Sequence, residues 1–126
     1  MLAIDHVQIA APPGSEAQAR RFFVGLLGLT ELPKQGATAA SGGIWLNTGT
    51  IQLHVGVTSS FVPVTKAHVA LSTSSSEQLH TLALTLQESG HPVQWDTRLP
   101  GVERFFTTDP WDNRLELMSA QAGPAL

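Results

Sequence analysis

The sequence predicts an α+β protein built from two β-α-β-β-β modules, residues 1–57 and 66–119, that together make one domain of residues 1–126. The main observation is an internal repeat, which reveals fold organisation when its period is constant. A shift of 62 residues places His6 on His68 and His54 on Glu116. Strand-like alternation surrounds all four positions, and one helix-like stretch follows the first strand of each half. These observations together indicate one supersecondary unit used twice.

In the first module, the alternation of residues 3–11 predicts a half-buried strand. Pro12 interrupts this strand, and Ser15 with Gln18 has the spacing of a capping box that begins a helix. Gly28 supplies the left-handed stop of that helix. We expect further strands at residues 29–33, 44–47 and 50–57, with a glycine-containing loop at 34–43.

The second module repeats the order after a connector at residues 56–65. Residues 66–72 predict a strand, and Ser74 with Glu77 has the capping-box spacing again. An apolar i, i+3, i+4, i+7 stripe continues this helix up to Gly90. Residues 93–96, 102–108 and 113–118 predict three more strands, and residues 119–126 form a tail without a clear pattern.

The composition excludes several classes of protein. A 42% hydrophobic content is enough for a buried core, and a net charge of −3 without charge runs excludes a nucleic-acid or anionic-membrane surface. No apolar run approaches the roughly 20 residues of a membrane helix, and the first residues lack the order of a signal peptide. The absence of cysteine excludes disulfides, thiolate nucleophiles and iron–sulfur clusters. We therefore expect a cytoplasmic protein with nitrogen and oxygen ligands.

The alternation along the strands indicates that the four repeated positions lie on the face of each sheet that is opposite the helices. Their apolar neighbours should face the helices, so the alternation sends His6, His54, His68 and Glu116 to the opposite face of each sheet. If the two mixed sheets curl so that these faces meet, the four side chains converge on a cleft. Imidazole and carboxylate ligands suit a divalent ion such as zinc, nickel, manganese or iron.

Each of these side chains has a simpler interpretation when it is taken alone. A single histidine on a strand is usually solvated or hydrogen-bonded, and Glu116 alone reads as an exposed carboxylate. His80 and His91 show that histidine also occurs in this chain without a repeated partner. The coincidence of period, strand phase and residue type at four places favours a metal site.

Four segments carry a family resemblance: IDHVQIA at residues 4–10, IQLHV at 51–55, AHVAL at 67–71 and DPWDNRLEL at 109–117. They resemble the glyoxalase/bleomycin resistance/dioxygenase group, the vicinal oxygen chelate superfamily, over residues 3–118. The family turn in the last segment usually carries glycine where Asp112 stands, and aspartate tolerates the positive φ that this turn requires. The resemblance implies a glyoxalase-like fold with ligands at His6, His54, His68 and Glu116.

The resemblance also implies a chemistry. Members of the superfamily use a metal with open coordination positions that chelates adjacent substrate oxygens and stabilises an oxyanion. We therefore expect a lyase or isomerase that acts on a small vicinal-oxygen substrate, with Glu116 as both ligand and catalytic base. Gln8, Gln52 and Arg114 share the cavity-facing phase and are the expected substrate contacts.

Several branches of the superfamily fit less well. Glyoxalase I itself has glutamate or a similar residue at the place of His54 and binds glutathione through an arginine and an asparagine, where this chain has Ala10 and Thr58. Ring-cleaving dioxygenases would use His6, His68 and Glu116, but they also use a tyrosine, and this chain has none. Fosfomycin-modifying enzymes need a cationic cradle, for which Arg114 is the only basic residue near Glu116 in the sequence.

The main alternative is a non-catalytic small-molecule binding protein of the bleomycin resistance type. Such proteins keep the fold, lack the metal and bind their ligand in a groove of the dimer. Aromatic side chains that suit either such a groove or a core are Trp45, Phe61, Phe105, Phe106 and Trp111. In both interpretations we expect a homodimer, because small curled sheets leave edges to cover. We expect no nucleic-acid or membrane partner.

Overall fold

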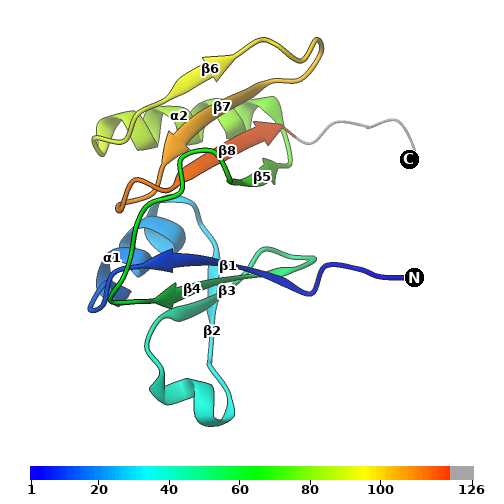
Figure 1. Cartoon of the computed structure of the whole chain (residues 1–126). Coiled ribbons are helices and arrows are strands. Elements are labelled where there is room, and N and C mark those ends of the chain that lie inside the picture. Colours follow the sequence, from blue (N-terminus) through cyan, green and yellow to red (C-terminus); the bar gives the residue numbers. More distant parts are fainter. Residues whose placement is uncertain (120–126) are drawn as a thin grey trace. The chain divides into compact units, whose positions relative to one another are not determined.

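A computed structural model describes residues 1–119 of the chain. It divides between Pro63 and Val64 into two compact units, each with the order strand, helix and three strands (Figure 1). The predicted β-α-β-β-β modules with mixed sheets are therefore confirmed. That both modules belong to one domain stays a prediction, and the tail expected at 119–126 lies, from residue 120 onward, outside the described residues.

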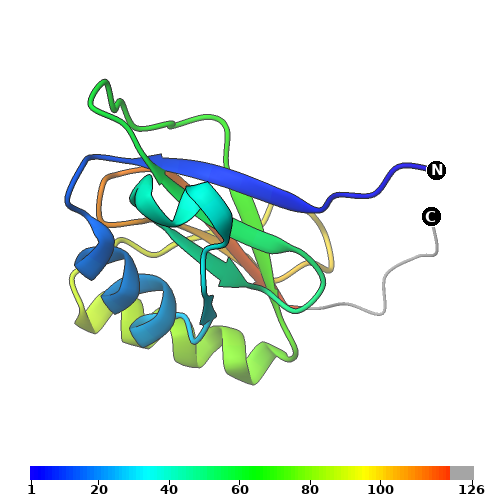
Figure 2. The same cartoon turned by 90° about the horizontal axis from the view of Figure 1, so that it is seen from below.

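The first unit carries one four-stranded sheet in the order β1-β4-β3-β2, in which β1 and β4 are parallel and the other neighbours antiparallel. Its helical segment lies on one face of this sheet (Figure 2). The elements are β1 (His6–Ala11), α1 (Glu16–Ala19), the π-helical η1 (Arg20–Leu26), β2 (Thr30–Leu32), the 3-10 helix η2 (Gly36–Ala40), β3 (Ile44–Asn47) and β4 (Gln52–Val57).

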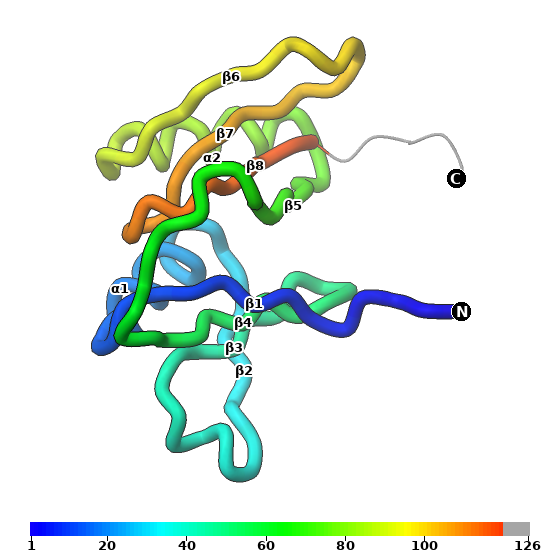
Figure 3. Tube along the Cα trace, viewed as in Figure 1, coloured from blue at the N-terminus to red at the C-terminus, as the bar shows by residue number. Residues whose placement is uncertain are grey.

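The second unit has the same strand order and directions, β5-β8-β7-β6, so its first and last strands are also parallel neighbours (Figure 3). None of the helices in the described part of the chain is long and apolar enough to cross a membrane. The elements of this unit are β5 (Val69–Thr73), α2 (Ser76–Glu88), β6 (Gln94–Asp96), β7 (Arg104–Thr108) and β8 (Arg114–Ser119).

The register of the parallel strands agrees with the repeat. Gln8 pairs with His54 in the first unit, and Ala70 pairs with Glu116 in the second, so the shift of 62 residues holds on both strands. The third strands follow a different shift, because Trp45 pairs with His54 whereas Phe106 pairs with Glu116, which is a shift of 61. The second hairpin holds one more turn residue than the first. This extra residue leaves the faces of the strands unchanged.

Each unit packs its helix against the apolar face of its own sheet. In the first unit the helix buries Phe22 and Phe23, which are at most 1% exposed. Burying a phenylalanine contributes about 2–3 kcal/mol, so these two rings form a large part of the core. Other fully buried apolar side chains are Leu46, Leu53, Phe105 and Leu115 on the strands, and Leu79 and Leu86 on the predicted apolar stripe of α2.

The beginnings of the helices differ from the predicted capping boxes. The Ser15 side chain makes no capping bond and instead donates to the carbonyl of Pro12, so the predicted box with Gln18 is wrong. In the second unit the cap is Ser75, one residue later than predicted, and its hydroxyl accepts from the backbone N–H of Gln78. Three consecutive serines make the frame of this motif ambiguous in the sequence.

The turn between β7 and β8 is closed by buried polar groups. Asp109 is 1% exposed and accepts hydrogen bonds from the backbone N–H groups of Trp111 and Asn113 and from the Asn113 side chain. The carbonyl oxygen of the Asn113 side chain accepts from the N–H of Val64. Asp112 has a φ of +69°, which confirms that aspartate occupies the left-handed position of this turn.

Candidate functional site

In the first unit, His6 and His54 lie side by side on the face of the sheet opposite the helix. His6 begins β1, and His54 lies in the middle of the parallel neighbour β4, diagonally across the register. Their rings stack with centroids 4.3 Å apart and an interplanar angle of 13°. Two of the expected metal ligands are therefore neighbours in this unit.

The ring of His54 lies between two other rings. Trp45, its cross-strand partner on β3, stacks against it with centroids 4.5 Å apart and an angle of 7°. Burial by these neighbours lowers the pKa of His54, and the charge of a protonated His6 would lower it further. The neutral imidazole, which is the form that binds metals, is therefore favoured at His54.

Hydrogen bonds orient both rings. The Nδ1 atom of His6 donates to the Asp5 carboxylate at 2.9 Å, which leaves Nε2 as its other ring nitrogen. In His54 the Nε2 atom donates to Oε1 of Gln52 at 2.8 Å, which leaves Nδ1. A histidine ligand commonly donates its second ring N–H to a carboxylate or carbonyl oxygen, so both rings have the hydrogen bonds that such a ligand needs.

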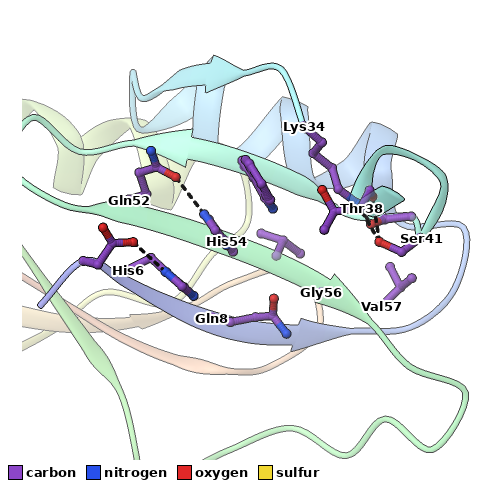
Figure 4. A pocket seen from close by; sticks show the side chains of 13 residues that line it. His6, Gln8, Lys34, Thr38, Ser41, Gln52, His54, Gly56 and Val57 are labelled. Carbon is purple, nitrogen blue, oxygen red and sulfur yellow. Dashed lines mark hydrogen bonds and ion pairs between the residues drawn. The ribbon is translucent and has the colours of Figure 1, made fainter. Parts of the chain in front are cut away.

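A cavity of about 540 Å³ opens over this face (Figure 4). The histidine pair and Gln52 line one end of it, and Gln8 lies farther along β1. Gly56 provides the space for Gln8, because a Cβ atom at this position would lie 2.5 Å from Nε2 of Gln8. The expected substrate contacts Gln8 and Gln52 thus both line the cavity.

In the second unit, His68 and Glu116 form the corresponding pair. His68 directly precedes β5, and its Nε2 atom lies 3.1 Å from Oε1 of Glu116 on β8. Its Nδ1 atom donates to the carbonyl of Lys66 at 3.0 Å, which is again the second hydrogen bond of a ligand histidine. The ring of Phe106 meets His68 edge-on with centroids 5.5 Å apart. Each unit therefore places an aromatic side chain of its third strand beside its pair.

Arg104 was not expected from the sequence to contact Glu116. Its guanidinium donates to Oε2 of Glu116 at 3.3 Å and to Asp96 at 3.1 Å, and both carboxylates are largely buried. Asp96 also binds Arg98, and these hydrogen bonds, the largest of them from Arg98, hold the pKa of Asp96 well below its usual range. Glu116 is therefore held on both oxygens, by a histidine and by an arginine.

Arg114, the third expected substrate contact, lies apart from this carboxylate network. Its guanidinium is 3.9 Å from the centroid of the Phe106 ring, and it lines a smaller cavity of about 230 Å³ in the second unit. The histidines outside the repeat have other partners: His80 donates to Glu103, and His91 donates to the carbonyl of Thr108.

Comparison with known proteins identifies the family. No protein-family model matches the chain, and no curated protein matches it in sequence. Among solved structures, a protein from Bacillus anthracis assigned to the glyoxalase family is 36% identical, with 96% of this chain and 97% of that chain covered and a TM-score of 0.87. The chain belongs to the glyoxalase family, within the vicinal oxygen chelate superfamily.

More distant structures share the glyoxalase fold at full length. A fosfomycin resistance protein from Listeria monocytogenes is 13% identical, with 97% of this chain and 96% of that chain covered and a TM-score of 0.75. A lactoylglutathione lyase from Agrobacterium tumefaciens is 17% identical, with 94% and 93% covered and a TM-score of 0.71. At these identities the comparison supports the fold and does not select one activity within the glyoxalase superfamily.

Each of the two units of this protein offers two side chains that can bind a metal ion. Among the described residues, no group of three or more histidine, aspartate or glutamate side chains is arranged to hold a metal ion. The donor atoms nonetheless suit a metal ion, because imidazole nitrogen and carboxylate oxygen are common ligands. Each of the three histidine rings also has a hydrogen bond that orients it. Two donors from one pair leave most of a coordination shell to other ligands.

Proposed function

We propose that this protein is a metal-dependent enzyme of the glyoxalase type, a lyase or isomerase that acts on a small substrate with adjacent oxygen atoms. The observation that carries the proposal is the repeated placement of two donor pairs: His6 at the start of β1 lies beside His54 on β4, and His68 directly before β5 lies beside Glu116 on β8. The buried member of each pair, His54 or Glu116, has a cost in desolvation that a ligand-binding role explains.

The proposed ligands are His6, His54, His68 and Glu116, with zinc, nickel, manganese or iron as the ion. When bound, the ion would act as a Lewis acid that stabilises an oxyanion on the substrate. Since one pair supplies two ligands, we propose that both pairs contribute to the shell, from one chain or from two copies in a homodimer. A sedimentation measurement that gives a monomer of 13.4 kDa at micromolar concentration would contradict the dimer.

The other proposed roles belong to side chains of the chain itself. Glu116 is the candidate base, because its carboxylate is the acidic group of the two pairs and Arg104 fixes its second oxygen. Gln8 and Gln52 offer amide groups to the substrate along the cavity, and Trp45 covers one side of His54 and keeps water from it. We place this activity in the cytoplasm, as expected for a chain without cysteine.

Metal content tests the proposal directly. We expect elemental analysis of protein purified without a histidine tag to find a divalent ion, and His6→Ala and His68→Ala to lose it. His80→Ala is the matched control, since His80 binds Glu103 on the exposed surface and should retain full metal content. Affinity should fall on acidification through the histidine range, near pH 6.5 for an unperturbed ring. If the three variants retain metal equally, or the unaltered protein binds none, the proposal is refuted.

Two observations favour a second candidate, a non-catalytic small-molecule binding protein. The cavity of the first unit has an aromatic wall at Trp45 and neutral amides at Gln8 and Gln52, which are typical of a binding pocket. Both oxygens of Glu116 are also already paired within the protein. Ligand binding that persists in a chelator, without any turnover, would support this alternative.

A further inference from the structure

The end of the first-unit cavity away from the histidine pair is formed by the loop that contains η2. Lys34, Thr38, Ser41 and Gly42 line this end, whereas His6, Gln52 and His54 line the other, with Gln8 between them (Figure 4). Lys34 is the only lysine or arginine among the residues that line this cavity. A substrate that reaches from the histidine pair to this loop therefore meets the ammonium group of Lys34.

The ammonium group of Lys34 is positioned by the loop itself. It donates to Oγ of Ser41 at 3.1 Å and to the carbonyl of Gly42. The Ser41 hydroxyl in turn donates to the carbonyl of Thr38, so Ser41 holds Lys34 in place. A lysine has three N–H donors, and the ion pairs found among residues 1–119 give Lys34 no carboxylate partner. One donor remains available to a ligand, and the Glu16 carboxylate interacts with the Lys34 charge without a direct ion pair.

The loop is fixed to the body of the unit at its C-terminal end. The backbone N–H of Gly43 donates to the Glu16 carboxylate at 2.9 Å. Gly43 has a φ of +80°, and a Cβ atom there would lie 2.0 Å from the carbonyl oxygen of Val55, so the end of the loop lies directly against the backbone of β4, where β3 begins to pair with it. Lys34 is thus presented by an anchored loop.

We propose that Lys34 binds a carboxylate of the substrate, which makes the substrate class small 2-hydroxy or 2-oxo carboxylic acids. This inference rests on the proposed function in one respect, that the adjacent oxygen atoms of the substrate bind near His6 and His54. One cation without an arginine matches a single negative charge, whereas a phosphate or phosphonate group would call for more donors and more positive charge.

The test is calorimetric titration with mandelate and with its uncharged amide, mandelamide. We expect the protein to bind mandelate roughly tenfold or more tightly than mandelamide, which corresponds to a hydrogen bond to a charged group. Lys34→Met should reduce the ratio of the mandelate affinity to the mandelamide affinity to about one, and Lys34→Arg should keep most of this affinity ratio. Lys66→Met is the matched control, because Lys66 lies outside the cavity lining and should leave the ratio unchanged.

Titrations with zinc and with a chelator separate the two proposals. An affinity ratio that depends on Lys34 in the presence of the chelator supports the carboxylate site, even if the protein takes up no zinc. Only the proposed metal function would then fail. A ratio near one in the unaltered protein, or an equal ratio in Lys34→Met, overturns the inference. Tighter Lys34-dependent binding of phenylphosphonate than of mandelate would overturn the substrate class.

Discussion

Replacement of Glu16 by alanine should loosen the loop that presents Lys34. The Glu16 carboxylate accepts from the N–H of Gly43 at 2.9 Å, and this hydrogen bond is the main reason that the pKa of Glu16 is lowered. A hydrogen bond to a charged group contributes about 1.5–3 kcal/mol, and the partial exposure of Glu16 reduces this to about 1 kcal/mol. We therefore expect the Gly43 amide to exchange its hydrogen about fivefold faster in the variant.

The assay is hydrogen exchange of the Gly43 amide followed by NMR, with Glu88→Ala as the control. Glu88 is exposed near the end of α2, in the other unit, so its removal should leave the exchange of Gly43 unchanged. Because the pKa of Glu16 is lowered in the folded protein, its contribution is present above the ordinary glutamate pKa and is lost as the pH falls below about 4. Unchanged exchange of Gly43 in a folded Glu16→Ala protein would refute the anchoring role.

Two further predictions concern the cavity and the last turn. In Gly56→Ala the new Cβ atom should displace the flexible Gln8 side chain, so mandelate affinity should fall as far as it does in Gln8→Ala; wild-type affinity in Gly56→Ala but not in Gln8→Ala would contradict this. In Asp109→Asn an amide N–H would face the Asn113 amide in a buried turn, which should cost about 1–3 kcal/mol in urea denaturation. An unchanged unfolding midpoint would show that the turn adapts.

The sequence was sufficient to predict the modules because strand alternation and the repeat are independent signals of the same arrangement. Period 2 on a half-buried strand determines which side chains share a face, so His6 and His54 were expected on one face, and they stack in the structure. The partners of these side chains were less accessible to prediction. Arg104 reaches Glu116 through the pairing of β7 with β8, and that register depends on the length of the turn.

Lys34 and the helix caps were missed for a different reason. The loop at 34–43 has no periodic pattern, so the sequence does not show that it folds back to β4 through Gly43. The Ser15 hydroxyl has a choice of nearby backbone partners, and it takes the carbonyl of Pro12. Such local competition is decided by backbone angles that a serine spacing alone does not determine.

The unequal shift of the third strands bears on the proposed site. A constant shift of 62 residues would place Trp45 on Thr107, whose side chain is buried on the helix-facing side with those of Phe105 and Leu115. The pairing instead sets Trp45 opposite His54 and Phe106 opposite Glu116, because the extra residue of the second hairpin lies in the turn. In both units an aromatic ring therefore faces the pair of polar side chains despite the change in length. This shared geometry adds one aromatic neighbour to each polar pair of the proposed site, Trp45 beside His54 and Phe106 beside His68.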